Sequence, residues 1–229
     1  MRIREIEGKL YPSVTTVLSA TDSRFKKEAL EKWKNEQLAK GLDPNEASSD
    51  GTKLHELLEF YLKNDYEFPD TKDYTMKAVR MFERYNRRFL KTNYIKPIGI
   101  EQFYKVELPN GLRYCGTIDL IAYVQSESTT PAKLEVIDHK SIGVMSKASS
   151  RMPNNKLQIA AYAKLLKESG IVVEGARVNF VSHEKTVAAP KDEFKSYLFT
   201  PEEIADNFAK FEERLIQFYE EGYMNEAIQ

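Results

Sequence analysis

Apolar residues recur at helical spacing through the first part of the chain, which predicts three helices before any strand. The first helix is expected over 23–40, with Gly41 placed to end it. The second is expected to begin near Ser49 and Asp50, which can cap it, and the third to span about 74–91. One face of the first helix is expected to be buried, and its residues are Phe25, Leu30, Trp33 and Leu38.

The centre of the chain changes to the alternating pattern of strands. The expected elements are a hairpin of strands over 97–108 and 112–124, a strand over 134–141, a helix over 154–168, strands over 176–183 and 193–199, and a helix from 201. The last helix has the clearest signal, because Thr200-Pro201-Glu202-Glu203 is a capping box with proline at the first helical position. This order of elements predicts an α/β fold, in which helices flank a sheet and form a helical N-terminal segment.

The composition predicts one soluble globular domain. A length of 229 residues suits a single domain, and an apolar content of 41% argues against disorder. No apolar run approaches the roughly 18 residues that a membrane span needs. The charged N-terminus lacks the pattern of a secretory signal, so a cytoplasmic location is expected. Because the net charge is −1, any site for a polyanion must be local.

The strand over 112–124 contains the single cysteine of the chain, Cys115. One cysteine excludes an internal disulfide and an iron–sulfur cluster held by four thiolates, so Cys115 is expected to be a small strand residue. The next residue, Gly116, has no side chain and is expected to let another part of the chain or a ligand approach closely.

One lysine and two carboxylates are spaced so that a single site can contain them. Side chains alternate along a strand, so Asp138 and Lys140 are expected on the same face. Asp119 lies on the preceding strand, and if the two strands pair, at about 4.8 Å, the two carboxylates can share a divalent cation. Such oxygen ligands suit Mg²⁺ or Mn²⁺. Alone, the spacing of Asp138 and Lys140 fits a salt-bridged sheet edge better, so the metal site depends on further motifs.

Further motifs follow one another from Tyr11 to about Leu166. They are YPSVTTVLS, GTKLHELLE, the strand position Glu101, GTIDL, EVIDHKS and QIAAYAKLL. With these motifs in this order, the chain resembles the PD-(D/E)XK nucleases, in particular the branch that contains the nuclease domain of RecB and the mitochondrial genome maintenance exonuclease. The resemblance implies a restriction-endonuclease-like α/β core with a mixed central sheet, one or two Mg²⁺ or Mn²⁺ ions, and hydrolysis of phosphodiester bonds in DNA.

The resemblance also implies a role for each matched residue. Asp119 and Asp138 would bind the metal with the backbone carbonyl of His139, and His55 would join them. Lys140 would orient or deprotonate the attacking water. The residues implied to lie near the metal ligands or the scissile strand are Glu101, Gln158 and Tyr162.

Two histidine assignments depend on the complete set of motifs. Taken alone, His55 is better explained as a surface histidine paired with Glu59 one helical turn later. The side chain of His139 alternates away from Asp138, so it is expected to pack on the other face of the sheet, leaving only its carbonyl for the metal.

Basic residues predict a local surface for DNA phosphates. The third helix carries a basic stripe at Lys77, Arg80, Arg84, Arg87, Arg88 and Lys91. A second cluster, Lys147, Arg151 and Lys156, follows the catalytic strand. The residues expected to contact DNA are Arg80, Arg84, Arg87, Arg88, Lys147 and Arg151. A solvated helix face would explain the stripe equally well.

These observations predict a metal-dependent DNA exonuclease that prefers single-stranded ends and acts in DNA replication, recombination or repair. One domain over 1–229 is expected, with an arch-like helical segment at 21–92, a catalytic sheet and helix at 97–183, and a C-terminal strand and helix at 193–229. Two alternatives stay open: a sequence-independent or structure-specific endonuclease, and a non-catalytic DNA-binding protein with a nuclease fold. The expected partner is single-stranded DNA, no membrane contact is expected, and no protein partner is identified.

Overall fold

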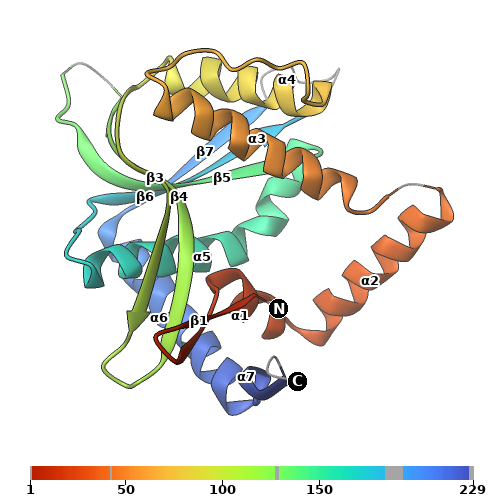
Figure 1. The fold of residues 1–229 in the computed structure, drawn as a ribbon, viewed down its shortest axis with the longest axis vertical. Coiled ribbons are helices and arrows are strands. Elements are labelled where there is room, and N and C mark those ends of the chain that lie inside the picture. The colour runs from red at the N-terminus through yellow and green to blue at the C-terminus, as the bar shows by residue number, and fades with distance from the viewer. Residues whose placement is uncertain (1, 42, 127–128, 184–192, 227–229) are drawn as a thin grey trace.

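A five-stranded mixed sheet forms the centre of the protein (Figure 1). This computed structural model describes residues 2–41, 43–126, 129–183 and 193–226. The strands, in their order across the sheet, are β3 (Tyr94–Glu107), β4 (Arg113–Gln125), β5 (Lys133–Ile142), β6 (Gly175–Ser182) and β7 (Phe194–Phe199). β5 and β6 run parallel, and the other neighbours run antiparallel. The expected α/β fold with a mixed sheet flanked by helices is confirmed.

Helices cover both faces of the sheet (Figure 1). On one face lie α3 (Glu46–Lys63), α4 (Met76–Tyr85) and the π-helical turn Asn86–Leu90. On the opposite face lie α1 (Val14–Ala20), α5 (Ala148–Glu168) and α6 (Pro201–Glu220). The smaller elements are strands β1 (Ile3–Ile6) and β2 (Lys9–Pro12), the 3-10 turn Met145–Lys147, and α7 (Tyr223–Glu226). Within the described ranges, no helix has the length and apolar content to cross a membrane.

Each central strand contributes to two apolar cores, because successive side chains point to opposite faces of the sheet. In β5, Val136 packs in the core formed with α1, α5 and α6, whereas Ile137 packs in the core formed with α3 and α4. Ile121 and Leu120 of β4 divide between the same two cores. A polar side chain in the middle of this sheet is therefore removed from water on both sides.

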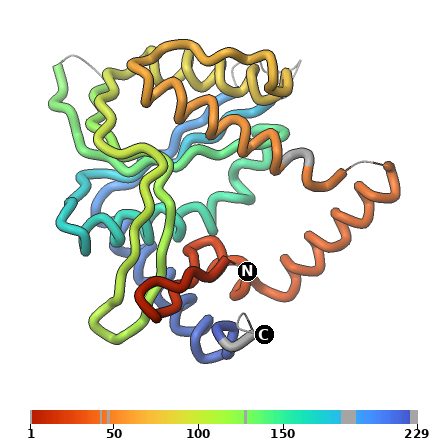
Figure 2. The backbone as a smooth tube through the Cα atoms, viewed as in Figure 1, coloured from red at the N-terminus to blue at the C-terminus, as the bar shows by residue number. Residues whose placement is uncertain are grey.

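Helix α2 (Arg24–Ala39) has nearly the predicted bounds but not the predicted burial. Ser23 caps it by accepting a hydrogen bond from Lys26 N, and Lys26 Nζ lies 3.3 Å from Asn154 Oδ1 in the second turn of α5. Beyond this first turn the helix extends away from the body (Figures 1 and 2). The exposed fractions of its large apolar residues are 81% for Phe25, 51% for Leu30, 39% for Trp33 and 60% for Leu38. The prediction of a buried face is wrong, because none of the described elements buries these side chains.

Two helix starts also differ from the prediction. α3 begins at Glu46, so Ser49 and Asp50 lie inside it and do not cap it. The buried Asp50 instead accepts a hydrogen bond from Thr75 Oγ1 at 2.5 Å, which joins α3 to the N-cap residue of α4. α5 begins at Ala148 and contains Pro153. Proline usually marks a helix start or break, which is why the pattern placed the start after it.

Residues 3–20 form a hairpin and a short helix that were not predicted. β1 and β2 contain only 4 residues each, too few for a clear alternation. Ser13 caps α1 by accepting a hydrogen bond from Thr16 N at 3.1 Å. A bridge between Ser13 and Cys115 holds this segment against β4. The N-terminal segment therefore lies beside the strand that carries Asp119.

Candidate metal and active site

Two carboxylates lie where strands β4 and β5 separate. The antiparallel register ends at Leu120 opposite Ile137, and Asp119 and Asp138 are the next residues of the two strands. Asp119 still reaches β5, because its Oδ2 accepts a hydrogen bond from His139 N at 2.7 Å. The strand pairing on which a shared site depends is therefore present.

His55 on α3 lies between Asp119 and Glu101 of β3. Its Nδ1 is 3.3 Å from Glu101 Oε1 and 3.7 Å from Asp119 Oδ1. Its Nε2 is 3.0 Å from the carbonyl oxygen of His139. One ligand atom from each of His55, Glu101 and Asp119 lies within 4.8 Å of the other two. These three side chains can therefore meet at one metal ion.

Glu101 enters this cluster through an uncommon backbone conformation. Its φ is +50°, in the left-handed region that few residues with a side chain adopt. Its neighbours Ile100 and Gln102 pair with β4 on either side of Asp119, so Glu101 lies across from Asp119. Such strain concentrates at functional sites. The sequence placed Glu101 only near the metal ligands, whereas here its carboxylate is one of the three candidate ligands themselves.

Asp138 and Lys140 lie on the same face of β5, as their alternation predicts. Lys140 Nζ lies 2.8 Å from Asp138 Oδ1. Gln158 on α5 donates to the same oxygen at 3.1 Å and contacts the Tyr162 hydroxyl at 2.9 Å. The four side chains form one connected network, which α5 holds against the sheet.

Burial and charge shift the pKa values of the site in opposite directions. Burial lowers the pKa of His55, but the carboxylates of Asp119 and Glu101 outweigh it and raise this pKa to about 9. Burial raises the pKa of Asp119, and it raises the pKa of Asp138 to about 6. Burial lowers the pKa of Lys140, but the two aspartates outweigh it and keep this pKa above its ordinary value. Without a metal, His55 and Lys140 are therefore the cations that balance the carboxylates.

The donor set fits a divalent cation. The Asp138 side chain is fully buried, and its Oδ2 has no hydrogen-bond partner among the described residues. An unpaired buried carboxylate oxygen is costly, and a cation between Asp138 and the cluster would offset that cost. Carboxylates, one imidazole and the carbonyl of His139 are ligands that Mg²⁺ or Mn²⁺ accepts. Asp138 itself lies outside the 4.8 Å group of His55, Glu101 and Asp119.

The side chain of His139 packs on the opposite face of the sheet, as its alternation predicts. Its Nδ1 lies 2.7 Å from the Tyr85 hydroxyl, which accepts a hydrogen bond from Asn179 Nδ2 at 2.8 Å. Burial holds the pKa of His139 well below its usual range, so this imidazole is neutral. The backbone of His139, and not its side chain, contacts the acidic cluster, through N to Asp119 and through the carbonyl oxygen to His55.

The predicted basic stripe is interrupted by burial. Arg84 is only 4% exposed, donates to the carbonyl oxygen of Ser182, and lies 3.2 Å from Glu193 Oε2. The prediction that Arg84 contacts DNA is wrong, because its charge is already paired inside the protein. It follows Met81 by three residues and precedes Tyr85, so it borders the buried face of α4. The exposed basic residues among those expected to contact DNA are Arg80, Arg87, Arg88, Lys147 and Arg151.

Gly116 permits the close approach that its position predicts, and the approaching group is Tyr162. A Cβ atom at Gly116 would lie 2.6 Å from Tyr162 Cε1. We expect Gly116→Ala to displace this ring and to lower the free energy of unfolding by about 1–3 kcal/mol, or ~2–4 °C in Tm per kcal/mol. Gly143→Ala is the matched control, because its Cβ would meet only His183 Nε2 at an ordinary 3.7 Å. Equal melting temperatures of the two variants would contradict this steric account.

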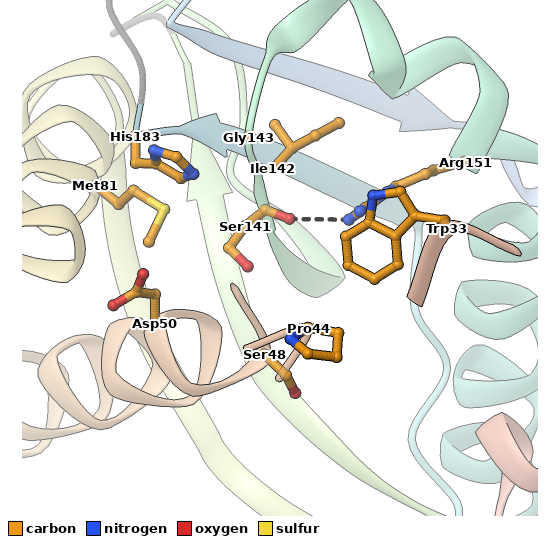
Figure 3. Close-up of a pocket in the computed structure, with 10 residues that line it drawn as sticks. All are labelled: Trp33, Pro44, Ser48, Asp50, Met81, Ser141, Ile142, Gly143, Arg151 and His183. Carbon is orange, nitrogen blue, oxygen red and sulfur yellow. Dashed lines mark hydrogen bonds between the residues drawn. The ribbon is translucent and has the colours of Figure 1, made fainter. Parts of the chain in front are cut away.

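Two cavities lie along the strands that carry the site residues. One, of about 200 Å³, is lined by Glu101 and Asp119 together with Arg2 and Arg4 of the N-terminal segment. The other, of about 310 Å³, lies at the end of β5 and includes Ser141 in its wall (Figure 3). The sequence analysis did not single out the two arginines. Their i, i+2 spacing was the available signal, since it predicts a shared face in a strand.

The comparisons with known proteins give only distant similarities. No known family profile and no curated protein sequence matches the chain. A provisionally assigned exonuclease from Eubacterium rectale is 12% identical with a TM-score of 0.48, over 74% of this chain and 66% of that protein. A phage-related exonuclease from Haemophilus somnus 129PT is 13% identical with a TM-score of 0.39, over 92% of this chain and 96% of that protein. Similarity this distant says nothing about activity, so the functional proposal rests on the side chains of the site.

Proposed function

We propose that this protein is a Mg²⁺- or Mn²⁺-dependent DNA nuclease. The observation that carries the proposal is the convergence of His55, Glu101 and Asp119 on one point. The pair of Lys140 and Asp138 beside them adds a cation and a further carboxylate. Hydrolysis of a phosphodiester builds negative charge at phosphorus and at the leaving oxygen, and a metal with a lysine offsets it. DNA as the substrate rests on the resemblance of the motifs to PD-(D/E)XK nucleases.

The chain's own ligands for the metal are carboxylates with one imidazole and one carbonyl. We assign them as His55, Glu101, Asp119, Asp138 and the backbone carbonyl of His139. When bound, a divalent cation supplies positive charge at the phosphate and makes nearby water more acidic. His55 has to lose a proton before it can ligate, because its pKa is raised to about 9 without metal.

Lys140 provides a positive charge that does not depend on the metal. Its raised pKa keeps the ammonium protonated at neutral pH, so it orients the attacking water and offsets charge at phosphorus. A protonated lysine cannot accept a proton, which favours orientation over deprotonation. Its side chain is 25% exposed and can meet a substrate, while Asp138, held by Gln158, fixes its direction.

The proposed reaction is exonucleolytic and prefers single-stranded ends, in DNA replication, recombination or repair. In support, α2 projects beyond the body, and Trp33 on it lines the cavity at the end of β5. We further propose that the arch-like segment 21–92, the catalytic sheet and helix at 97–183 and the C-terminal segment 193–229 act as one nuclease domain. Residues 227–229 of the last segment lie outside the described residues.

The test is metal-dependent cleavage of end-labelled DNA. We expect single-stranded DNA to be degraded with Mg²⁺ or Mn²⁺ and left intact with EDTA. Metal binding should also stabilise the fold, by about 2.7 kcal/mol at a concentration 100-fold above Kd. His55→Ala should weaken this stabilisation, whereas Glu59→Ala, one helical turn further on α3, should not. Cleavage in EDTA would contradict the metal proposal, and binding without cleavage under all metals would favour the non-catalytic alternative.

A further inference from the structure

Helix α2 supplies an aromatic side chain to the larger cavity beside the site. No residue of α2 is buried, yet Trp33 lines this cavity with Pro44 and Ser48 (Figure 3). Trp33 is the single tryptophan of the chain and is 39% exposed. A partly exposed indole at a cavity wall offers a flat surface on which a nucleobase can stack.

The cavity lies immediately beyond the catalytic strand residue Lys140. Ser141, Ile142 and Gly143 at the end of β5 form part of its wall. Its volume of about 310 Å³ is near the lower limit for small-ligand pockets, which span ~300–1,000 Å³. A cavity of this size suits one unit of a polymer that also reaches Lys140.

Arg151 on α5 gives the cavity a cation without an acidic partner. Its Nη1 donates to the carbonyl oxygen of Ser141 at 3.2 Å, and no carboxylate pairs with it among the described residues. Arg151 is exposed and lines the cavity, so its guanidinium can be reached by a ligand and has no counter-charge among the described residues. An anion at this position would compensate the positive charge of Arg151. A phosphate is suited to this role, because it can accept two parallel hydrogen bonds from a guanidinium group.

The acidic residue of the cavity lies away from Arg151. In Figure 3, Asp50 and Arg151 stand at opposite sides of the cavity, with Ser141 between them. Asp50 accepts a hydrogen bond from Thr75 Oγ1, and its carboxylate lies 3.9 Å from Lys77 Nζ. The negative charge of Asp50 is therefore partly compensated within the protein. An anion is therefore favoured beside Arg151 and disfavoured beside Asp50.

We propose that this cavity binds one nucleotide of a single-stranded DNA substrate, with its base stacked on Trp33 and its phosphate paired with Arg151. The inference rests on the proposed nuclease function and identifies where the strand next to the scissile phosphate lies. Stacking tolerates any base, so the site does not select a sequence. It draws the strand past the end of β5 toward Lys140.

Tryptophan fluorescence tests the proposal without any cleavage, because Trp33 is the single tryptophan. Oligo(dT) titrated into the protein in EDTA should change Trp33 fluorescence in a saturable way. Arg151→Ala should weaken this binding and reduce its salt slope by about 0.7, as expected for one lost phosphate contact on a single strand. Arg24→Ala on α2 is the matched control, since this arginine is 93% exposed, pairs with Glu28, and does not line the cavity.

A labelled oligonucleotide followed by anisotropy tests the stacking itself. Trp33→Ala should weaken binding roughly 5- to 150-fold, the equivalent of ~1–3 kcal/mol per stacked base, and Trp33→Phe should retain most of it. Phe25→Ala is the control, because Phe25 is on the same helix, 81% exposed and outside the cavity wall. None of these changes removes a core residue, so loss of folding does not explain a loss of binding.

Separate outcomes overturn the inference and the proposed function. Oligonucleotide binding by anisotropy without any change in Trp33 fluorescence would overturn the nucleotide site and leave the nuclease proposal intact. Free dTMP binding as tightly as oligo(dT) would also overturn it, since the cavity would then bind a mononucleotide product. Specific quenching by oligo(dT) in a protein that cleaves no DNA with any metal would support the site and contradict the nuclease proposal.

Discussion

Replacing Asp138 with Asn, or Lys140 with Ala, is expected to lower the rate of DNA cleavage by at least ~10²–10³-fold while leaving DNA binding largely unchanged. Asp138 binds and directs the Lys140 ammonium at 2.8 Å, and its unpaired Oδ2 is proposed to ligate the metal. In the proposed mechanism, both groups act on charge that develops during the reaction. Their loss should therefore lower kcat more than it weakens substrate binding.

Stability measurements distinguish this loss of function from a loss of folding. Burial raises the pKa of Asp138 to about 6, above its ordinary value, so at neutral pH the charged carboxylate destabilises the metal-free fold. Metal-free Asp138→Asn should consequently melt at the same temperature as the unmodified protein or higher. Lys133→Ala, at the exposed start of β5, is the matched control for Lys140→Ala and should cleave normally. Cleavage by both Asp138→Asn and Lys140→Ala at the normal rate would contradict the assigned roles.

Local patterns predicted most of the sheet, because its strands are bounded by clear turns and the three central strands, β4, β5 and β6, are mostly buried. The hairpin of β3 and β4 turns at the predicted Pro109-Asn110-Gly111, where Gly111 has a φ of +81°. The capping box at Thr200 starts α6 as predicted, with Glu203 N donating to Thr200 Oγ1 at 3.2 Å. These signals act within a few residues, so sequence alone reveals them.

The failed predictions concern contacts that local spacing does not determine. Helical spacing placed Phe25 and Trp33 on one face of α2 but did not show whether another element covers that face. Arg84 has the spacing of a surface stripe, yet its partner Glu193 lies more than 100 residues away along the chain. Burial of a charged side chain depends on such distant partners, which a single sequence does not display.

The candidate site was predictable only in part, for the same reason. Alternation along β5 placed Asp138 and Lys140 on one face, and the 2.8 Å contact agrees. His55 reaches the site from α3 and contacts the carbonyl oxygen of His139, which lies 84 residues later in the chain. Only the motif resemblance predicted that His55 belongs to the site. Glu101 joins through a φ of +50°, a conformation that strand alternation does not anticipate.

The topology of the substrate is also expected to have a large effect on the rate of cleavage. Linear single-stranded DNA should be degraded, whereas a covalently closed circle of the same sequence should remain intact. Trp33 of the projecting α2 and Arg151 of α5 both line the cavity at the end of β5 (Figure 3). The first turn of α2 contacts α5, where Lys26 Nζ lies 3.3 Å from Asn154 Oδ1. Helix α3 then runs back over the sheet (Figure 1). If the substrate strand passes between these elements, as proposed, it has to enter by an end.

The comparison requires equal concentrations of the two forms, with Mg²⁺ and with the product lengths resolved on a gel. A duplex contains two paired strands and is thicker than one strand, so blunt linear duplex should be degraded more slowly than linear single strands. Asp138→Asn assayed in parallel shows which cleavage belongs to this site and which to a contaminating nuclease. If the circle is cut as fast as the linear form, and Asp138→Asn abolishes both, the strand enters sideways through an open cleft. The protein would then be the endonuclease of the alternative prediction, with the same metal ligands and a different route for the substrate.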